Sequence, residues 1–274
     1  MGVESRHTVS VLIPTFNSGG TLSIALQSIV AQTYDAVEVV IMDGASSDDT
    51  LEVAESFRDR LPGLKVYSEK DSGVYDAMNK AMVHATGDWI IFLGSDDRFY
   101  NAEVLAAMAT HFGNSTAKVL YGNVAVVGDA GWAADGTLYD GPFDTLKLLN
   151  KNICHQAIFY QREFVAKLIG NFSLKYPVIS DWDFNLRCWA RAPFEYVDLT
   201  ICYFVAGGVS THGRDVAFAK DRIENIIDYF AIDVFDPLID TPEFACYPEL
   251  VRKQQKEHPI RYQIRRFQRK FKRK

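Results

Sequence analysis

The first part of the chain alternates short apolar runs with longer amphipathic segments. Four runs rich in β-branched residues share the length and composition of buried parallel strands. They cover residues 9–14, 37–43, 64–69 and 88–94. Apolar residues recur at helical spacing in the segments between them, which cover residues 21–30, 50–58 and 74–85. This alternation predicts an α/β fold in which helices flank a wound, mostly parallel sheet.

The periodicity becomes less regular in the second half of the chain. A further helix is expected over residues 102–112, a mixed strand over 201–208 and helical structure over 216–235. Residues 121–143 combine glycine with aromatic residues and show no clean period. Because there is no internal repeat and no linker rich in proline or serine, we expect this region to complete the same domain.

The composition is that of a globular protein, but the charge is unevenly distributed. The 274 residues are 48% hydrophobic and 23% charged, which excludes a disordered or fibrous protein. Residues 252–274 hold 11 of the 29 basic residues and one of the 35 acidic residues, which leaves 18 basic and 34 acidic residues in the body. An acidic body does not attract nucleic acid, so no nucleic-acid partner is expected.

The basic tail, residues 252–274, has the pattern of an amphipathic helix. Its apolar residues recur at spacings of four, three and four, at Ile260, Ile264, Phe267 and Phe271. Basic residues fill the other faces. Two interpretations remain open: the tail is solvated or packs on the acidic body, or its apolar and cationic faces bind an anionic membrane surface.

The chain carries no strong signal for membrane insertion or for disulfides. No apolar run approaches the roughly 18 residues needed to span a bilayer. The first residues lack the layout of a signal peptide, so we expect a cytoplasmic protein, peripheral at the inner face of the cell membrane through the basic tail. The four cysteines form no CxxC pair, which favours buried reduced thiols over disulfides or zinc.

Polar side chains follow each of the four predicted strands. Asn17 follows the first strand, Asp43 the second, Asp71 the third, and Asp96 and Asp97 the fourth. In open α/β sheets, ligands bind beyond the carboxyl ends of the strands. A cluster of carboxylates tolerates a nucleoside diphosphate when a divalent cation lies between them, and paired acids suit Mg²⁺ or Mn²⁺. Asp96 and Asp97 are therefore candidate metal ligands, although an Asp-Asp pair also forms turns and caps helices.

The motifs of this region exclude two nucleotide-binding folds and resemble a third. No GxGxxG follows the first strand and no GxxxxGK[ST] occurs, which excludes the dinucleotide-binding and P-loop motifs. Three segments, VSVLIPTFN, VVIMDGASSDDT and KDSGVYDAMNKAMVHATGDWIIFLGSDD, closely resemble the inverting family 2 glycosyltransferases of the GT-A fold. The resemblance covers residues 8–110, with several motifs in the matching order and spacing.

The resemblance implies a nucleotide-sugar donor and residues that bind it. Those residues are Pro14, Thr15, Asn17, Asp43, Asp71, Gly73, Ser95 and Asp96, with Asn79 as a weaker correspondence. Asp96 is placed in the metal-binding DXD motif. Where many relatives have Asp-x-Asp-Asp, this chain has Gly94-Ser95-Asp96-Asp97, so the first carboxylate is missing. The segment 207–212 resembles another part of the family's site, which makes His212 a candidate for the diphosphate and its metal, although a plain turn also explains the glycines.

Inverting transfer also requires a base that removes the proton from the acceptor hydroxyl. The segment VISDWDFNLRCW resembles the family's acidic motif, which makes Asp181 the candidate base and Asp183 its local competitor. Helix capping is an alternative role for Asp181, because an apolar periodic stretch follows it. His155-Gln156 resembles another recurrent element, and either shapes the pocket near donor or acceptor or is a buried hydrogen-bonded pair.

The resemblance therefore implies a GT-A glycosyltransferase domain at residues 1–215, a C-terminal helical extension at 216–251 and the basic tail. The implied reaction transfers a sugar from a nucleotide-diphosphate sugar, with UDP as the expected nucleotide and dTDP or GDP as alternatives. The implied acceptor is a saccharide or lipid-linked saccharide in cell-surface polysaccharide biosynthesis, and the implied cofactor is Mg²⁺ or Mn²⁺. The alternative is a non-catalytic module that binds a nucleotide sugar or a glycan.

Overall fold

The structure is a computed structural model that describes residues 6–208, 215–232, 256, 259–260 and 263–264. The chain divides into two compact units, residues 1–218 and 219–274. The first unit holds the sheet and the candidate site, and α9 (Val216–Tyr229) begins at its end. Most of the basic tail lies outside the described residues. Two of its residues that are described, Ile260 and Ile264, are exposed. No helix among the described residues is both long and apolar enough to cross a bilayer.

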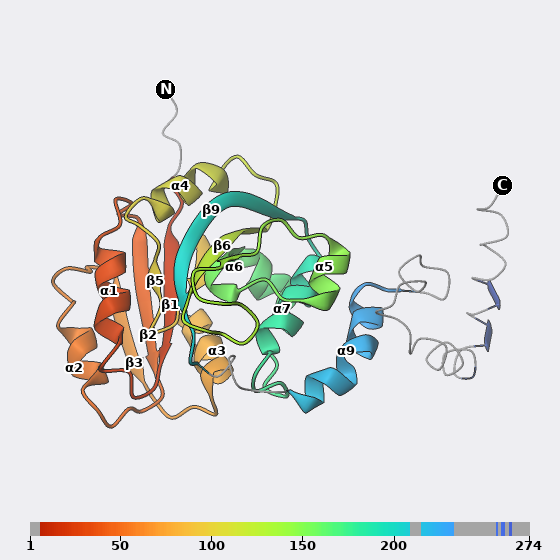
Figure 1. Ribbon diagram of the computed structural model, residues 1–274, viewed down its shortest axis with the longest axis horizontal. Helices are drawn as coiled ribbons and strands as arrows, with labels where there is room; N and C mark the ends of the chain where they lie inside the picture. The colour runs from red at the N-terminus through yellow and green to blue at the C-terminus, as the bar shows by residue number, and fades with distance from the viewer. Residues whose placement is uncertain (1–5, 209–214, 233–255, 257–258, 261–262, 265–274) are drawn as a thin grey trace. The chain divides into compact units, whose positions relative to one another are not determined.

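The predicted parallel sheet is present in the first half of the chain. Four parallel strands lie in the order β3-β2-β1-β4 (Figure 1). They are β1 (Val9–Thr15), β2 (Val37–Asp43), β3 (Leu64–Ser68) and β4 (Trp89–Phe92). All four residues of β4 are buried, as expected for a strand that is covered on both faces of the sheet.

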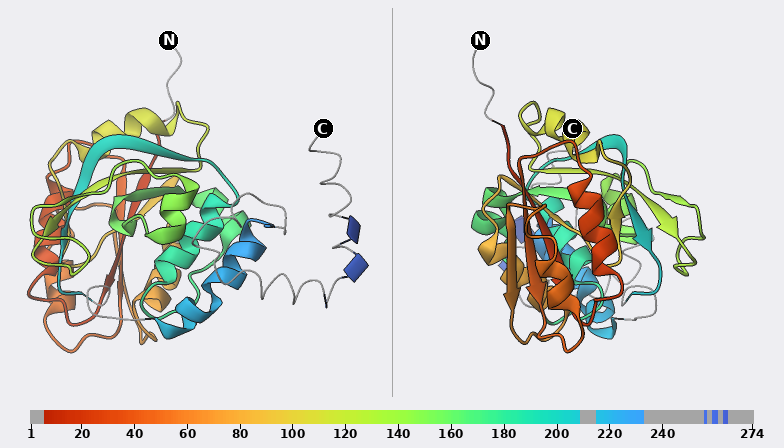
Figure 2. Two further views of the ribbon diagram at one scale, coloured as in Figure 1. Left: turned by 45° about the vertical axis from the view of Figure 1, so that its right-hand side comes forward. Right: turned by 90° about the vertical axis from the view of Figure 1, so that its left-hand side faces the viewer.

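Helices cover both faces of this parallel sheet. The connecting helices are α1 (Leu22–Val30), α2 (Thr50–Glu55) and α3 (Val74–His84). The chain adds β2 and β3 on one side of β1 and then returns to place β4 on the other side. Because parallel crossovers are right-handed, this reversal moves α3 to the face opposite α1, as the edge-on view in Figure 2 shows. The order in which the chain adds strands to the sheet reverses between β1 and β4. In α/β sheets, a ligand crevice forms at such a point.

The second half of the sheet is mixed. From β4 the strand order continues β8-β6-β9-β5, with β7 paired to β6. These strands are β5 (Arg98–Phe99), β6 (Val119–Val127), β7 (Leu138–Tyr139), β8 (Ile158–Gln161) and β9 (Phe194–Val205). β8 runs antiparallel to β4 and β6, whereas β9 runs parallel to β6. Of the strand predicted over residues 201–208, residues 201–205 form the last part of β9, and residues 206–208 lie beyond its end.

The irregular pattern around β6 has a physical cause. The pairing of β6 with β9 shifts register between Tyr121 and Asn123. Asn123 is buried, its Nδ2 donates to the Tyr196 hydroxyl (2.9 Å), and its Oδ1 accepts from the Gly141 amide (2.7 Å). A buried polar residue at a register shift interrupts the alternation that identifies a strand. The sequence pattern therefore did not predict β6.

Helical segments complete the unit and approach the ends of the strands. They are α4 (Val104–Phe112), α5 (Thr145–Asn150), η1 (His155–Ala157), α6 (Arg162–Phe164), η2 (Val165–Ile169) and α7 (Ser180–Trp189). η1 contacts β4, β6 and β9, and α7 precedes β9 in the chain. Of the four residues expected on the apolar face of the helix over 74–85, Met78, Ala81 and Ala85 are buried and Val74 is half-buried.

Candidate functional site

A cleft of about 400 Å³, which we call the strand-end cleft, opens at the carboxyl ends of β1 and β4. Residues predicted from the sequence that line it are Pro14, Asn17, Ser95, Asp96 and Asp97. The facing residues come from η1 and from the end of β9, namely His155, Gln156, Phe204 and Val205. The structure thus brings the loops after the first and fourth strands into one cleft.

Asp43 organises the loops at the ends of β1, β2 and β3. It is fully buried, and its carboxylate accepts hydrogen bonds from the Thr15 hydroxyl (3.2 Å), the Ser46 amide (3.0 Å) and the Ser68 hydroxyl (2.7 Å). Burial acts to raise the pKa of Asp43, but the hydrogen bonds outweigh it and hold the pKa below its ordinary value. Asp43 and Thr15 therefore fix the loops beside the strand-end cleft rather than line it.

Asp71 and Gly73, which follow β3, lie beside the same loops. A Cβ added at Gly44 would come within 2.5 Å of Asp71 Oδ2 and 3.3 Å of the Phe16 ring, and Phe16 lines the strand-end cleft. Asp71 Oδ1 accepts from the Gly73 amide (2.9 Å). Gly73 has a φ of 123°, which suits glycine, and it precedes α3. Asp71 therefore lies beside Gly44 and Phe16, at the rim of the strand-end cleft.

Asp97 joins the end of β4 to η1 and β9. Its Oδ1 accepts from the Val205 amide (2.9 Å), and its Oδ2 accepts from the Gln156 side chain (2.9 Å) and the Gly94 amide (3.3 Å). The residue is only 1% exposed. Burial and, next, the charge of Asp96 raise the pKa of Asp97 to about 6, against the effect of these donors. Asp97 therefore loses its proton less readily than an ordinary aspartate.

Gly94 makes this packing of the two acids possible. A Cβ at position 94 would lie 2.5 Å from Asp97 Oδ2 and 2.9 Å from Asp96 Oδ1. A side chain at position 94 would therefore require the carboxylates of Asp96 and Asp97 to shift.

The donor set of Asp96 and Asp97 fits a hard divalent cation. Asp96 lines the strand-end cleft, and burial raises its pKa because its carboxylate gains no donor in the described part of the chain beyond its own backbone. Two adjacent carboxylates with raised pKa values are relieved by a cation, and Mg²⁺ is commonly held by one or two carboxylates plus substrate phosphates. Within the described ranges, no group of three His, Cys, Asp or Glu side chains forms a metal site. His212 lies outside these ranges.

Asn79 is not brought to the strand-end cleft. It is buried in α3, where its Nδ2 donates to the Phe172 carbonyl (3.0 Å) and its Oδ1 accepts from the Phe172 amide (2.7 Å). This clamp uses both ends of the side-chain amide and fixes the segment after η2 against α3. Asn79 was expected to help bind the nucleotide sugar, but its side chain instead holds two segments of the chain together.

A second cavity of about 280 Å³, which we call the aromatic cleft, adjoins the first. Its lining includes Asp181 and the aromatic residues Trp132, Tyr139, Trp182 and Phe204. Residues that line both cavities are Tyr75, His155, Gln156, Val178 and Phe204. The strand-end cleft and the aromatic cleft therefore meet at these shared residues, which we call the junction.

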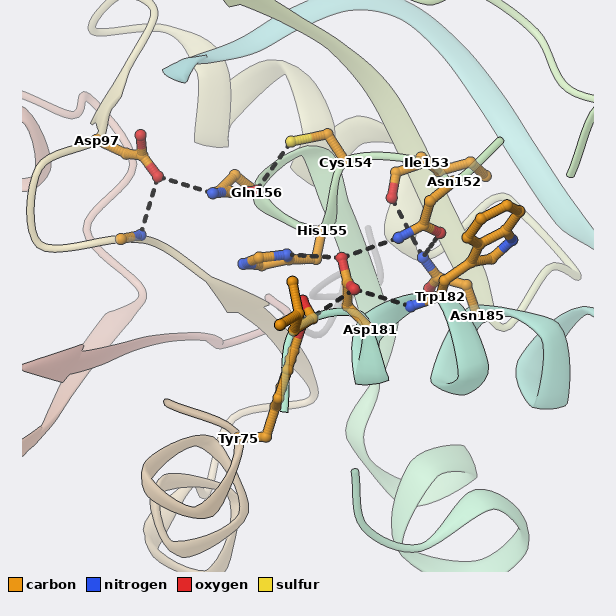
Figure 3. Close-up of polar contacts among 12 residues, drawn as sticks. Tyr75, Asp97, Asn152, Ile153, Cys154, His155, Gln156, Asp181, Trp182 and Asn185 are labelled. Atoms are coloured by element: carbon orange, nitrogen blue, oxygen red, sulfur yellow. Dashed lines mark hydrogen bonds and ion pairs between the residues drawn. The ribbon is translucent and has the colours of Figure 1, made fainter. Parts of the chain in front are cut away.

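Asp181 lies in the first turn of α7 and is contacted from several elements (Figure 3). Its Oδ1 accepts from the Trp182 amide (2.9 Å) and lies 3.1 Å from the Tyr75 hydroxyl. Its Oδ2 accepts from the Asn152 side chain (2.8 Å) and lies 3.2 Å from His155 Nδ1. The positive end of the α7 dipole also favours negative charge here. These contacts fix the orientation of the Asp181 carboxylate at the edge of the aromatic cleft.

The alternatives considered for Asp181 and Asp183 are resolved by their contacts. The Asp183 side chain is 1% exposed and accepts from Arg187 Nε (2.9 Å) in an ion pair within α7. Ile179 occupies the N-cap position of α7, and no side chain caps the helix there. Asp183 is therefore a structural residue, and Asp181 does not act as the helix cap.

A buried hydroxyl and a buried amide determine how Asn152 faces Asp181. The Tyr160 hydroxyl donates to Asn185 Oδ1 (2.7 Å), and Asn185 Nδ2 donates to Asn152 Oδ1 (2.8 Å). With its oxygen engaged in this way, Asn152 presents its nitrogen to Asp181. Tyr160 and Asn185 are fully buried, so this orientation is protected from water.

Sequence reasoning missed several residues of the aromatic cleft and the junction. The resemblance assigned no site role to Tyr75, Asn152 or Tyr139. The available signal was the density of polar side chains in the segment 150–156, which reads NKNICHQ. Such a run is unusual directly before a buried strand, and it supplies three of the side chains around Asp181 and Asp97.

This arrangement suits a reaction between two bound molecules. The strand-end cleft offers oxygen ligands for a cation beside loops that leave room for an anionic group. The aromatic cleft offers apolar walls and an oriented carboxylate, with a histidine at the junction. A bond between the two molecules would form where the two cavities meet.

Comparisons with known proteins identify the family of the chain. The model of glycosyl transferase family 2 matches residues 10–167. A PGL/p-HBAD biosynthesis glycosyltransferase of Mycobacterium bovis is 40% identical over 217 residues, which cover 77% of this chain and 82% of the relative. An uncharacterized glycosyltransferase of Mycobacterium tuberculosis is 33% identical over 226 residues, which cover 80% of this chain and 83% of that relative.

Solved structures show the same fold. S. aureus TarS in complex with UDP-GlcNAc superposes with a TM-score of 0.69 at 22% identity, over 88% of this chain and 71% of that chain. The mannosyltransferase PcManGT from Pyrobaculum calidifontis, in complex with GDP-Man and Mn²⁺, gives a TM-score of 0.58 at 20% identity, over 83% and 64% of the two chains. The predicted GT-A fold is confirmed. With its fold, its strand-end motifs and the family match over more than half of its length, the chain belongs to glycosyl transferase family 2.

Proposed function

We propose that this glycosyltransferase moves a sugar from a nucleoside-diphosphate sugar to an acceptor hydroxyl with inversion at the anomeric carbon. The observation that carries the proposal is the junction, where a cleft built from the strand-end motifs meets a cleft that contains Asp181. With the donor in the strand-end cleft and the acceptor in the aromatic cleft, the acceptor hydroxyl faces the donor's anomeric carbon from the side opposite the diphosphate. Attack opposite the leaving diphosphate inverts the configuration.

The donor is held by the loops after β1 and β4. Pro14, Asn17 and Ser95 line the strand-end cleft, and Asp43 and Asp71 fix the loops at its rim. UDP is the proposed nucleotide, in keeping with the UDP-GlcNAc complex of the structural neighbour TarS. The nucleotide and the donor sugar define the first substrate class of the site.

Asp96, the carboxylate of the DXD motif, would hold Mg²⁺ or Mn²⁺ together with Asp97. When bound there, the cation supplies positive charge that offsets the negative charge of the diphosphate. The support is the pair of carboxylates with raised pKa values that line the strand-end cleft. The structural neighbour PcManGT was solved with Mn²⁺ and GDP-Man.

The acceptor is proposed to be a saccharide or lipid-linked saccharide of the cell surface. Trp132, Tyr139 and Trp182 line the aromatic cleft, and aromatic rings pack well against the apolar faces of sugars. The 40% identical relative is named for PGL/p-HBAD biosynthesis. The basic tail would keep such an acceptor close by binding an anionic membrane surface.

A screen of nucleotide sugars tests the proposal. UDP-, GDP- and dTDP-sugars are added to the full chain with and without Mn²⁺, and the melting temperature is measured. Saturation at 100 times Kd stabilises a protein by about 2.7 kcal/mol, so a matched donor gives a clear shift. We expect the shift to be larger with Mn²⁺, and release of nucleoside diphosphate to follow when an acceptor is added.

The Asp181→Asn variant separates catalysis from binding. Asp181 is the proposed base that takes the proton from the acceptor hydroxyl. Its replacement by Asn should lower turnover by about 10² to 10⁴, while the donor-induced shift in melting temperature remains. Asp198→Asn is the matched control, because Asp198 also accepts from a tyrosine hydroxyl (Tyr196, 2.8 Å) but is exposed and lines neither cleft. A melting shift without any release of nucleoside diphosphate by the wild type would identify a binding module instead.

A further inference from the structure

Two hydrogen-bond donors occupy one oxygen of the Asp181 carboxylate. Oδ2 accepts from Asn152 Nδ2 (2.8 Å) and lies 3.2 Å from His155 Nδ1. A carboxylate without a proton can only accept, so Nδ1 carries a hydrogen and donates it to Oδ2. A carboxylate offers about four lone-pair positions, which are shared between its two oxygens. Both positions of Oδ2 are therefore in use.

The other oxygen of this carboxylate keeps a position open. Oδ1 accepts from the Trp182 amide (2.9 Å). The Tyr75 hydroxyl lies 3.1 Å from Oδ1, but its single hydrogen is directed to the Val178 carbonyl, which is closer (2.8 Å). Among the described residues, therefore, no donor fills the second position of Oδ1. Because Asp181 lines the aromatic cleft, this position is where the carboxylate can receive a proton from a bound acceptor.

His155 lies on an anchored element beside this carboxylate. It begins η1, and the following Gln156 donates to Asp97 Oδ2 in the loop after β4 (2.9 Å). The imidazole ring is 15% exposed and the Asp181 side chain 14%. Figure 3 shows the Nδ1 edge of the ring facing Asp181 and the opposite edge pointing away from it. The contact to Oδ2 is therefore largely shielded from water, and its donor is held in place by the neighbouring residue.

The donors at Oδ2 restrain the carboxylate torsion of Asp181. This torsion is broad and roughly two-fold in an aspartate, so a carboxylate without restraints can exchange its two oxygens. Asn152 supplies one restraint at Oδ2, and His155 supplies the second. Removing one of these donors widens the range of torsions, and a displacement of about 1 Å at a reacting group can cost about 10²-fold in rate.

We propose that His155 is a positioning residue of the transfer, whose Nδ1–H holds Oδ2 of Asp181 so that Oδ1 receives the proton of the acceptor hydroxyl. The acceptor O–H bond breaks and the proton passes to Oδ1, while the oxygen's electron pair forms the bond to the anomeric carbon. The bond from the anomeric carbon to the diphosphate oxygen breaks, and its electron pair leaves with the nucleoside diphosphate. His155 keeps its hydrogen throughout. This inference rests on the proposed function and names the atom of Asp181 that acts in it.

Two variants of the full chain that differ in one group test the role of Nδ1. Asn and Leu both branch at Cγ, as the imidazole ring does, so His155→Asn can place an amide nitrogen near the position of Nδ1, where His155→Leu places a methyl group. Turnover is measured as nucleoside diphosphate released from UDP-, GDP- and dTDP-sugars with Mn²⁺ and a panel of p-nitrophenyl glycosides as acceptors. His155→Leu should lower kcat by about 10²-fold, with the KM values of donor and acceptor within about threefold of the wild type. His155→Asn should have a kcat at least about tenfold above that of His155→Leu, because its amide can donate to Oδ2.

Three controls separate positioning from effects on folding and packing. The donor-induced shift in melting temperature should be kept in both variants, since binding of the nucleotide sugar does not depend on the torsion of Asp181. His111→Leu is the matched control: His111 also lies beside a carboxylate (Glu195, 3.4 Å) but lines neither cleft, so its kcat should match the wild type. His155→Ala also lacks the donor and fills less space, so it should lose kcat in the same way. It covers the case in which the leucine variant does not fold.

Each outcome decides the proposal. A folded His155→Leu or His155→Ala with a kcat within about threefold of the wild type overturns it, since no donor is then needed at Oδ2. A His155→Asn variant that keeps the donor-induced shift but turns over no faster than His155→Leu also overturns it, because another property of the imidazole ring is then required. A loss that appears in KM instead of kcat makes His155 a substrate contact and overturns it as well. Failure of the wild type to release nucleoside diphosphate from any nucleotide sugar would refute the proposed function and this inference together.

Discussion

Glu38 ties the four parallel strands together at the end of the sheet opposite the strand-end cleft. It lies on β2, its side chain is 8% exposed, and it accepts from Lys65 Nζ on β3 (2.7 Å) and from the Ser10 hydroxyl on β1. The Thr86 hydroxyl (2.7 Å), the Thr86 amide (2.5 Å) and the Gly87 amide (3.0 Å), just before β4, also donate to it. Replacing Glu38 by Gln removes the charge and turns an amide group toward these donors.

The structure gives the magnitude of the loss. Burial acts to raise the pKa of Glu38, but Lys65 and the other donors outweigh it and lower the pKa from 4.5 to about 2. A difference of about 2.5 pKa units at 1.36 kcal/mol each corresponds to about 3 kcal/mol of stability at neutral pH. Because the pKa is lowered on folding, this contribution is complete above the unfolded pKa and is lost as the pH falls toward about 2.

Urea unfolding followed by tryptophan fluorescence measures this loss. Glu38→Gln should lower the free energy of unfolding by about 3 kcal/mol at pH 7 and by about half as much near pH 3. Turnover of the folded variant should match the wild type, since Glu38 is far from both clefts in the strand register. Glu55→Gln is the control: Glu55 pairs with Arg58 but is 50% exposed, so its loss should stay below about 0.5 kcal/mol. Equal losses for the two variants, or a Glu38→Gln loss that does not shrink in acid, would refute the reasoning.

Three further predictions concern the site and the tail. Because the pKa of Asp97 is raised to about 6, protons compete with Mn²⁺ for this carboxylate. Titration calorimetry should show the affinity for Mn²⁺ rising about tenfold per pH unit below pH 6 and levelling off above pH 7. An affinity for Mn²⁺ that does not depend on pH would remove Asp97 from the cation site. Asn185→Leu leaves the Tyr160 hydroxyl unpaired and frees Asn152 to turn, so we expect a loss of about 1 to 3 kcal/mol in urea unfolding and a lower kcat at an unchanged donor KM; an unchanged kcat would mean that the amide chain does not orient Asp181. Anionic liposomes should float the full chain but not a chain truncated after Val251, and equal flotation would exclude the tail as an anchor.

The parallel half of the fold could be predicted from the sequence because its strands are buried on both faces. Such strands read as continuous apolar runs, and the predicted runs lie within a residue or two of β1 to β4. The mixed half could not be predicted in the same way. β5 and β7 are two residues long and exist through pairing with β9 and β6, and β6 contains the buried Asn123 at its register shift.

The donor side of the candidate site could be predicted from the sequence, whereas the junction could not. The donor side could be predicted because the ends of parallel strands converge at one edge, which places Asn17 and Asp96 together without further information. The junction unites Tyr75 of α3, His155 of η1 and, beside them, Asp181 of α7, and no local pattern specifies that these segments meet. The resemblance suggested Asp181, but the contacts that orient it come from the folded chain.

The anomeric configuration of the product tests the central claim most directly. The full chain is incubated with the nucleotide sugar that stabilises it, Mn²⁺ and a saccharide acceptor, and the product is examined by proton NMR while nucleoside diphosphate is quantified. A donor and an acceptor that meet at the junction from opposite sides predict one inverted glycoside for each nucleoside diphosphate released. A product that retains the donor's configuration, or a wild-type chain that forms no glycoside, would contradict the account.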